Sequence, residues 1–137
     1  MDIHINYLAV IVAALSNMVI GSIWYSPMLF GNLWMKLAGV KMGGKNPMPS
    51  YIIAYVFALI VAYVMAHFIY FGAVGMGTDL TVTSAITTAF WAWLGFVAPA
   101  TSGMVTWEMK PWSYWFIVAG YWLVSLVAMA AILAVWK

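Results

Sequence analysis

The sequence predicts an all-α membrane protein: a four-helix bundle of transmembrane helices, with a short interfacial amphipathic helix between spans one and two. The chain is 67% hydrophobic and only 6% charged, whereas soluble domains carry about 25% charged residues. Its five lysines and three acidic residues lie in five short clusters. The charge-free intervals between them, 3–35, 46–78, 80–107 and 111–136, each exceed the ~20 apolar residues that cross a bilayer as a helix. Because a charge in hydrocarbon is costly, the clusters mark the connections.

The first span covers about residues 5–24. It ends before Pro27, because the residue preceding a proline leaves the helical region. A signal peptide is the competing interpretation. However, no Lys or Arg precedes the apolar run, and bulky aromatics stand where a cleavage site needs small residues. We therefore expect a retained span.

Residues 28–40 have the spacing of an amphipathic helix lying in the membrane interface. Their apolar positions are Leu29, Phe30, Leu33, Trp34 and Leu37, and Lys36 and Lys41 are expected toward the headgroups. Gly43, Gly44, Pro47 and Pro49 then predict a loop. The second span covers about residues 51–71 and ends in a glycine-rich turn before Asp79.

The third span covers about residues 80–98 and the fourth about 113–136. Pro99 leaves the carbonyl of Gly95 without its helical partner, so we expect a kink or an end of the third helix there. Four spans occupy nearly all of residues 1–137, which leaves a single transmembrane domain with no room for a soluble one.

Lysine placement predicts the orientation. The 1–2 and 3–4 connections hold four lysines, and the opposite side holds only Lys137. The positive-inside rule puts these two connections in the cytoplasm and both termini outside. We thus expect a multi-pass protein of the inner cell membrane. Four spans also place His4, His67, Asp2 and Asp79 together on the other side.

Those four residues are the candidate metal ligands. Two His and two carboxylates are suitable donors for Zn or Cu, although their spacing does not require a metal. In span two, Tyr63, His67 and Tyr70 share one helix face. An intramembrane His is either a functional group or a side chain bonded near the outer end of its helix.

Span two also carries a small residue at every fourth position: Ala54, Ala58, Ala62 and Ala66. Small residues at this spacing let two helix backbones approach closely. This alanine seam predicts packing inside the four-helix bundle, with a subunit interface as the alternative.

Asn17 lies at mid-membrane depth in span one and needs a hydrogen-bond partner there. Ser84, Thr87 or Thr88 of span three could supply it. We favour interhelical hydrogen bonding over a polar lining for a solute path, since Ser and Thr can also bond their own helix carbonyls.

Two blocks of the chain resemble the domain-of-unknown-function 1761 (DUF1761) family of small bacterial integral membrane proteins. The first block contains the interfacial motif Trp24, Tyr25, Ser26 and Pro27, and continues to Phe30-Gly31 and Trp34-Met35. The second block runs from Trp93 to Pro99 and on through Glu108, Lys110-Pro111-Trp112 and Gly120-Tyr121-Trp122-Leu123, and Ala66-His67 in span two adds to it. Trp122 departs from the family pattern, where a His is expected. The resemblance implies four spans and no established activity.

No catalytic motif is present: there is no HExxH, P-loop or nucleophile elbow. Cys is absent, and no basic stripe suggests nucleic acid. We therefore expect a non-enzymatic protein without a cofactor that contacts the lipid bilayer and forms a homo-oligomer or joins a membrane complex. The alternative is an oligomeric channel or transporter for a small solute or ion, with a polar path including His67 and Asn17. A membrane enzyme would have only His67 and Glu108 as candidate groups.

Overall fold

Four membrane-length helices build the protein. The computed structural model describes residues 3–40 and 46–137, and those residues form helices and connections without a strand. The four segments long and apolar enough to span a membrane are Tyr7–Trp24, Met48–Gly75, Val82–Thr106 and Trp112–Val135. The prediction of an all-α fold with four membrane-length helices is therefore confirmed. Asp2, Lys41, Lys45 and the predicted Gly43-Gly44 loop lie outside the described residues.

The first helix, α1 (Tyr7–Trp24), begins at a side-chain cap. The Asn6 carbonyl Oδ1 accepts hydrogen bonds from the amides of Leu8 and Ala9, at 3.1 and 3.3 Å. These bonds satisfy two amides that have no partner within the helix. A short helix, α2 (Gly31–Ala38), follows within the segment predicted to be amphipathic. It ends at Gly39, whose φ of 72° is the left-handed conformation that glycine adopts readily.

Helix α3 (Met48–Gly75) is longer than expected at both ends. Pro49 stands in its first turn rather than in a loop, because the first helical amides need no intrahelical partner and proline is tolerated there. The helix also continues beyond Phe71 for another turn before the chain reverses at Gly77, where φ is 67°.

The third span passes through Pro99 instead of ending at Ala98. It comprises α4 (Val82–Ala92), the π-helical turn η1 (Trp93–Val97), α5 (Ala98–Thr101) and α6 (Gly103–Thr106). The Ala98 amide donates to the carbonyl of Trp93, five residues earlier. This wider turn accommodates the proline that would otherwise clash with a regular α-helix.

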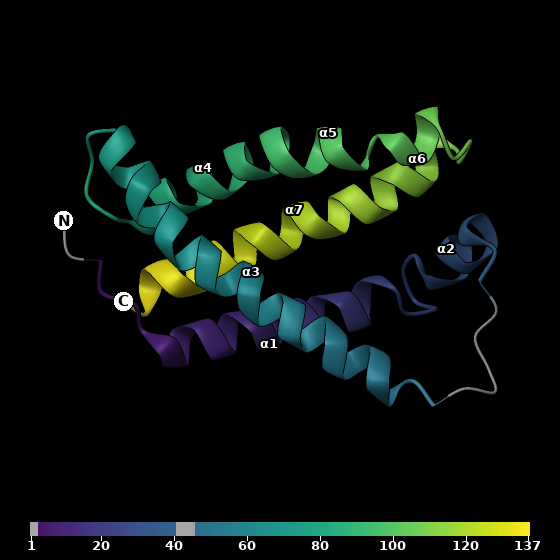
Figure 1. The fold of residues 1–137 in the computed structure, drawn as a ribbon, viewed down its shortest axis with the longest axis horizontal. Helices are drawn as coiled ribbons and strands as arrows, with labels where there is room; N and C mark the ends of the chain where they lie inside the picture. Colours follow the sequence, from purple (N-terminus) through teal and green to yellow (C-terminus); the bar gives the residue numbers. More distant parts are fainter. Residues whose placement is uncertain (1–2, 41–45) are drawn as a thin grey trace.

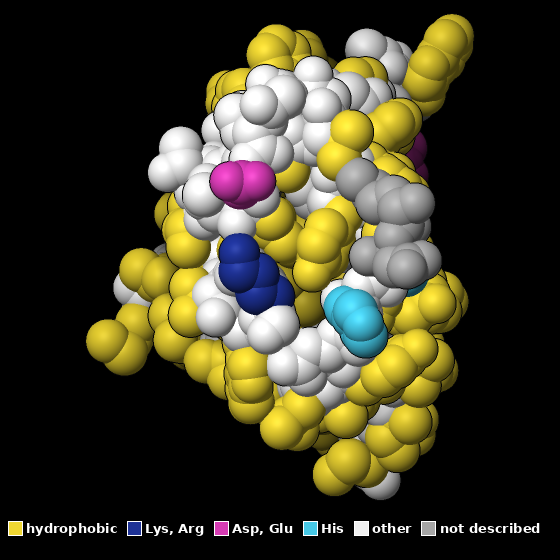
Figure 2. Space-filling model, turned by 90° about the vertical axis from the view of Figure 1, so that its left-hand side faces the viewer, with side chains coloured by type: hydrophobic (Ala, Val, Ile, Leu, Met, Phe, Trp, Pro, Cys, Tyr) yellow, Lys and Arg dark blue, Asp and Glu magenta, His cyan; other side chains and the backbone are white. Residues whose placement is uncertain are grey.

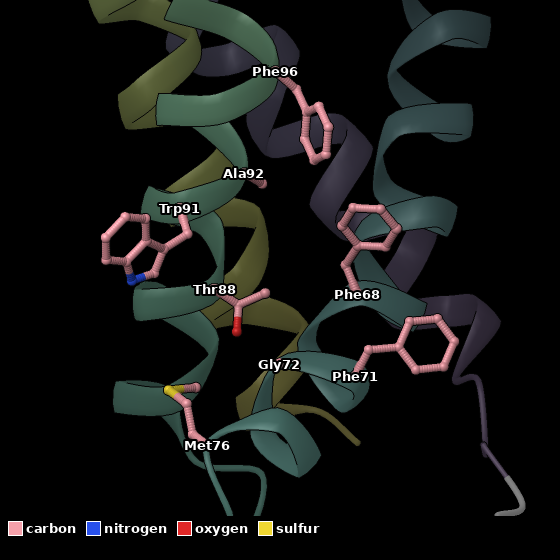
Figure 3. A pocket seen from close by; sticks show the side chains of 8 residues that line it. All are labelled: Phe68, Phe71, Gly72, Met76, Thr88, Trp91, Ala92 and Phe96. Carbon is pink, nitrogen blue, oxygen red and sulfur yellow. The ribbon is translucent and has the colours of Figure 1, made fainter.

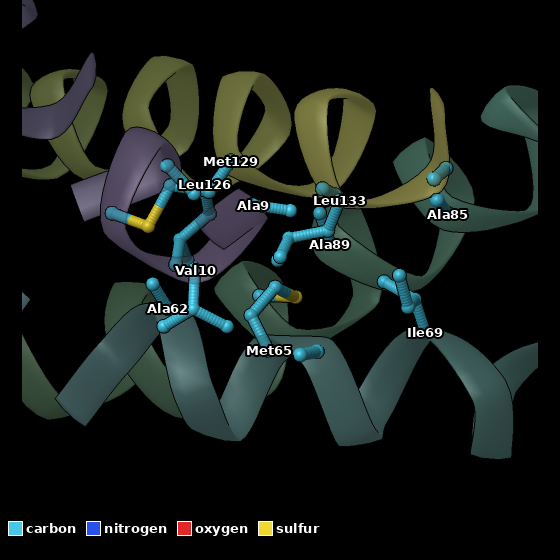
Figure 4. Close-up of a cluster of buried hydrophobic side chains, with 14 of the residues drawn as sticks. Ala9, Val10, Ala62, Met65, Ile69, Ala85, Ala89, Leu126, Met129 and Leu133 are labelled. Atoms are coloured by element: carbon cyan, nitrogen blue, oxygen red, sulfur yellow. The ribbon is translucent and has the colours of Figure 1, made fainter. Parts of the chain in front are cut away.

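Helix α7 (Trp112–Val135) lies between α1 and α4, and α3 crosses the same assembly (Figure 1). The core between them is built mostly of alanines, with larger apolar side chains interleaved (Figure 4). Met129 and Ile69 are fully buried there. Small side chains let the helix axes approach closely, so that van der Waals contact stabilises the packing in lipid.

The two ends of the molecule are joined by different connections. At one end, the side-chain amide of Asn6 donates through Nδ2 to the Trp136 carbonyl at 3.2 Å. Lys137 Nζ donates to the Leu80 carbonyl at 2.7 Å. At the other end, Lys110 Nζ donates to the Leu37 carbonyl at 3.0 Å. The start of α1, the end of α7 and the α3–α4 turn thus share one end, while α2 and the 3–4 connection share the opposite end (Figure 1).

Candidate functional site

A buried polar cluster joins α1 to α7 in the middle of the protein. Asn17 is 4% exposed, and its Oδ1 accepts hydrogen bonds from the Tyr121 phenol at 2.5 Å and from the Ser125 hydroxyl. The Tyr121 oxygen also lies 3.1 Å from the Asn17 backbone carbonyl. The Asn17 side chain is therefore bonded across a helix interface, as we expected of a buried amide.

The partner of Asn17 comes from the fourth span and not from the third. The Thr87 and Thr88 hydroxyls donate to carbonyls one turn earlier in α4, at 2.8 and 2.9 Å. The Ser84 hydroxyl lies 2.9 Å from the Thr81 amide, which donates to it as part of a capping box that starts α4. Our prediction of a partner among these three residues is wrong, because each of their hydroxyls bonds locally.

The interfacial motif folds the chain back at the lysine-bearing end. Trp24 Nε1 donates to the Ile117 carbonyl at 2.9 Å, which ties the end of α1 to α7. The Ser26 carbonyl accepts from the amides of Leu29 and Gly31 at 3.1 and 3.0 Å. A Cβ on Gly31 would lie 2.3 Å from the Tyr25 carbonyl oxygen. The turn after Pro27 thus requires glycine at position 31.

Tyr25 extends the aromatic contacts from this turn toward the buried cluster. Its ring lies edge-on to Trp34 of α2 at 5.3 Å and to Tyr121 at 5.4 Å between centroids. Burial raises the pKa of the Tyr25 phenol well above its ordinary value, and the nearby Tyr121 and Tyr114 phenols raise it further. Tyr25 is therefore uncharged at physiological pH, and its ring packs against Trp34 and Tyr121.

Two further indoles fasten α7 to the third span around the π-helical turn. Trp93 Nε1 donates to the Ala119 carbonyl at 2.7 Å. Trp115 Nε1 lies 3.1 Å from the Thr101 hydroxyl and 3.3 Å from the Ala98 carbonyl. The indole N–H groups of Trp93 and Trp115 therefore join α7 to the third span on both sides of the π-helical turn.

His67 and Tyr63 lie together on α3, but Tyr70 bonds elsewhere. His67 Nδ1 is 2.9 Å from the Tyr63 carbonyl, and the two rings are 4.8 Å apart. The Tyr70 phenol donates to the His4 backbone carbonyl at 3.3 Å. The structure thus gives His67 a partner within its own helix, so it shares no hydrogen bond with Asn17.

The candidate metal ligands do not converge in the described part of the chain. Asp2 lies outside the described residues, and Asp79 and His4 are exposed. Among residues 3–40 and 46–137, no three His, Asp or Glu side chains lie close enough to hold a metal ion. Figure 2 looks onto this end of the molecule, where a few ionisable side chains stand among polar backbone and apolar surface.

The alanine seam is mostly inside the protein. Ala58, Ala62 and Ala66 are at most 4% exposed and belong to the core. Ala54 is exposed, because residues 48–57 of α3 extend beyond the packed helices, with only Tyr55 half-buried. The seam therefore packs α3 within its own chain over three of its four positions.

An apolar trough lies on the outside of the protein, between α3 and the α4–η1 segment. It consists of two adjoining hollows of about 400 and 250 Å³ that share Phe68, Ala92 and Phe96. The Phe68 and Phe96 rings are 6.4 Å apart and mark the junction. Figure 3 shows the first hollow, with Thr88, Trp91, Ala92 and Phe96 on the α4–η1 side and Phe68, Phe71 and Gly72 on the α3 side. We name this feature the α3–α4 trough.

The trough contains almost no polar group. Thr88 is the one hydroxyl at its wall, and its donor is already bonded to the Ser84 carbonyl. Gly72 brings the two helices into close contact, since a Cβ on it would lie 1.9 Å from Thr88 Oγ1. The trough therefore suits hydrocarbon or apolar side chains rather than a solute.

The model of a family described as "Protein of unknown function (DUF1761)" matches residues 8–134, which is nearly the whole chain. The chain belongs to the DUF1761 family. Comparison with curated proteins and with solved structures found no match. Membership of DUF1761 confirms the resemblance found in the sequence and brings no activity with it.

Within this DUF1761 chain, sequence reasoning missed Tyr121 and Ser125 as the partners of Asn17. The signal was present: the two hydroxyls stand four residues apart and so share one face of the fourth span. It also missed Trp93, whose indole bonds across to α7. Asn17, Tyr121, Ser125 and Trp93 therefore hold helices together, and the distinctive outer feature is the α3–α4 trough.

Proposed function

We propose that this protein is a non-enzymatic membrane subunit that acts by associating with other membrane-spanning helices. The α3–α4 trough is the observation that carries this proposal. In lipid, apolar exposure alone does not drive association, because lipid tails are as apolar as Leu. Close packing of complementary shapes does so, and a hollow between helices is a shape that another helix can fill. The start of α3, residues 48–57, is mostly exposed and offers additional helix surface.

The interior supports the same proposal. Asn17 is bonded to Tyr121 and Ser125, and the Thr87 and Thr88 hydroxyls bond their own helix. These polar groups are thus engaged in hydrogen bonds, either across the α1–α7 interface or within their own helix. Chemistry at a substrate would require groups that remain available in a cleft, and the apolar trough offers none.

Purification into lipid nanodiscs directly from the native membrane, followed by native mass spectrometry, tests the proposal. We expect either a homo-oligomer or a stable complex with another membrane protein. A monomer accompanied only by lipid would contradict the proposal.

We further propose that the end carrying Lys36 and Lys110 faces the cytoplasm and that both termini lie outside. A thiol reagent that does not cross the membrane should label Thr78→Cys when it is added outside intact cells. It should not label Asn32→Cys under the same conditions.

The alternative function is an oligomeric channel or transporter whose path includes His67 and Asn17. It has less support, because Asn17 and His67 bond in separate places within the chain. Solute flux in proteoliposomes that is lost in both His67→Ala and Asn17→Ala would favour this alternative over association alone.

A further inference from the structure

We infer that the protein binds one structural water molecule in a small pocket where the start of α1, the second half of α3 and the end of α7 meet. The pocket has a volume of about 10 Å³, which we name the end pocket. Its apolar wall is formed by Ala9, Ala66, Ile69 and Leu133. One water molecule needs about 10–15 Å³ and two to four polar partners. The end pocket is therefore the size of a single water and too small for a larger ligand.

Two hydrogen bonds between distant segments border the end pocket. The Tyr70 phenol donates to the His4 carbonyl at 3.3 Å, and Asn6 Nδ2 donates to the Trp136 carbonyl at 3.2 Å. All four of these residues line the pocket. Because a carbonyl oxygen has two lone pairs, the carbonyls of His4 and Trp136 each retain the capacity to accept a second hydrogen bond. Both are acceptors for a water in the pocket.

Lys137 supplies the matching donor. Its Nζ donates to the Leu80 carbonyl at 2.7 Å, which uses one of the three N–H groups of the ammonium. Lys137 also lines the end pocket, so a further N–H serves the water. The water then accepts from Lys137 and donates to the carbonyls of His4 and Trp136. Three hydrogen bonds are the usual number for a buried water.

The layer below the end pocket is dry. One turn deeper on α1, α3 and α7 stand Ala13, Ala62 and Met129, and none of the three has any exposed surface. A close-packed apolar layer offers a water neither space nor a hydrogen-bond partner. Asn17 lies one further turn along α1. The end pocket and the buried polar cluster are therefore separated by a complete apolar layer.

This separation gives the water a structural role. A channel through a single chain would require water to continue from the end pocket to Asn17, and the apolar layer interrupts that route. The water instead bridges the residues before α1 to the end of α7, beside the bond from Tyr70 of α3. The inference stands independently of the association proposed above, because every group that it uses belongs to one chain.

NMR of the protein in bicelles, with ¹³C-labelled Ala and Ile methyl groups, tests the inference. Magnetisation transfer from water should reach the methyl groups of Ala9 and Ile69, although these residues are only 0 and 1% exposed. Ala13 is the matched control, because it is equally buried on the same helix and does not line the pocket. It should show no transfer. Absence of transfer at Ala9 and Ile69 would overturn the inference, and so would equal transfer at Ala13, since the hydration would then not be confined to the pocket.

Tyr70→Phe separates a bound water from the exchangeable proton of the phenol. The substitution removes that proton and leaves Lys137 and the carbonyls of His4 and Trp136 in place. We therefore expect the transfer from water to Ala9 to remain in Tyr70→Phe. Loss of the transfer in this variant would identify the phenol as its source and would overturn the bound water.

Discussion

The Tyr121 phenol reaches Asn17 across the α1–α7 interface at 2.5 Å, and Gly21 makes room for it. Gly21 lies one turn after Asn17, and a Cβ there would already stand 3.2 Å from the Tyr121 oxygen. The Tyr25 ring also packs edge-on to Tyr121, with 5.4 Å between ring centroids. A turn at the membrane interface is thereby connected to a buried amide by side chains from two helices.

Removing the hydrogen bond between Asn17 and Tyr121 should cost measurable stability. For Asn17→Ala and Tyr121→Phe, we expect a coupling free energy of about 0.6–2 kcal/mol, the range for interhelical hydrogen bonds in lipid. The measurement is the free energy of unfolding of both single variants and the double variant in bicelles. Thr87→Ala is the control, because that hydroxyl bonds its own helix. Strictly additive effects of the two changes would contradict the bond.

The crossing of α3 and α4 should tolerate no side chain at position 72. Gly72→Ala places a methyl group 1.9 Å from Thr88 Oγ1, so the helices must separate, at a cost of about 1–3 kcal/mol for overpacking. Gly75→Ala is the matched control, since no heavy atom lies within 4 Å of its added Cβ. Thermal unfolding of the two variants in the same detergent should separate them, and equal stabilities would show that the helices are farther apart.

The turn that carries α2 should depend on glycine at position 31. In Gly31→Ala, the new Cβ meets backbone atoms of Tyr25 and Ser26 at 2.3–2.8 Å, and a backbone cannot move aside as a flexible side chain does. We expect lower stability and loss of protection of the Trp34 region from proteolysis. Gly95→Ala adds a methyl group into open space and should leave proteolysis unchanged. Wild-type protection in Gly31→Ala would refute the described turn.

The alanine seam should be sensitive to size only where it is buried. Ala62→Leu inserts a large side chain at a position with no exposure, whereas Ala54→Leu changes an exposed one. We expect about 1–3 kcal/mol of destabilisation for Ala62→Leu and little change for Ala54→Leu. Unfolding in bicelles measures both. If Ala54→Leu instead abolishes assembly without affecting the fold, the start of α3 belongs to a subunit contact.

Alkaline pH should destabilise the protein in part through Tyr25. Burial raises the pKa of this phenol, so the fold favours its neutral form. The associated stability is fully present below the ordinary Tyr pKa of about 10, and it is lost as pH rises toward the raised pKa. Tyr25→Phe should therefore lose less stability than the wild type between about pH 8 and about pH 11. An identical pH dependence of unfolding in both proteins would show that Tyr25 is solvated.

The structure also shows why some local predictions failed. Pro99 was expected to kink or end the third helix; the helix does not end there, because a π-helical turn at Trp93–Val97 carries it onward. Trp93 is separated by 26 residues from Ala119, whose carbonyl accepts its indole hydrogen bond. No local spacing rule relates two residues so far apart in the sequence. Likewise, Ser84 was a chemically suitable partner for Asn17, but its hydroxyl closes a cap at the start of α4.

The sequence by itself determined how many helices span the membrane and which connections share an end. This follows because a charged side chain is costly inside the hydrocarbon. The lengths of the charge-free intervals along the chain therefore indicate which segments can cross the membrane. The tertiary structure alone decided which faces of those helices meet. It paired Asn17 with Tyr121 and Ser125, placed Ala58, Ala62 and Ala66 inside, and left the α3–α4 trough outside. Helix rotation and crossing depend on side-chain shapes brought together from distant segments, and apolar residues facing the core and the lipid are alike in composition.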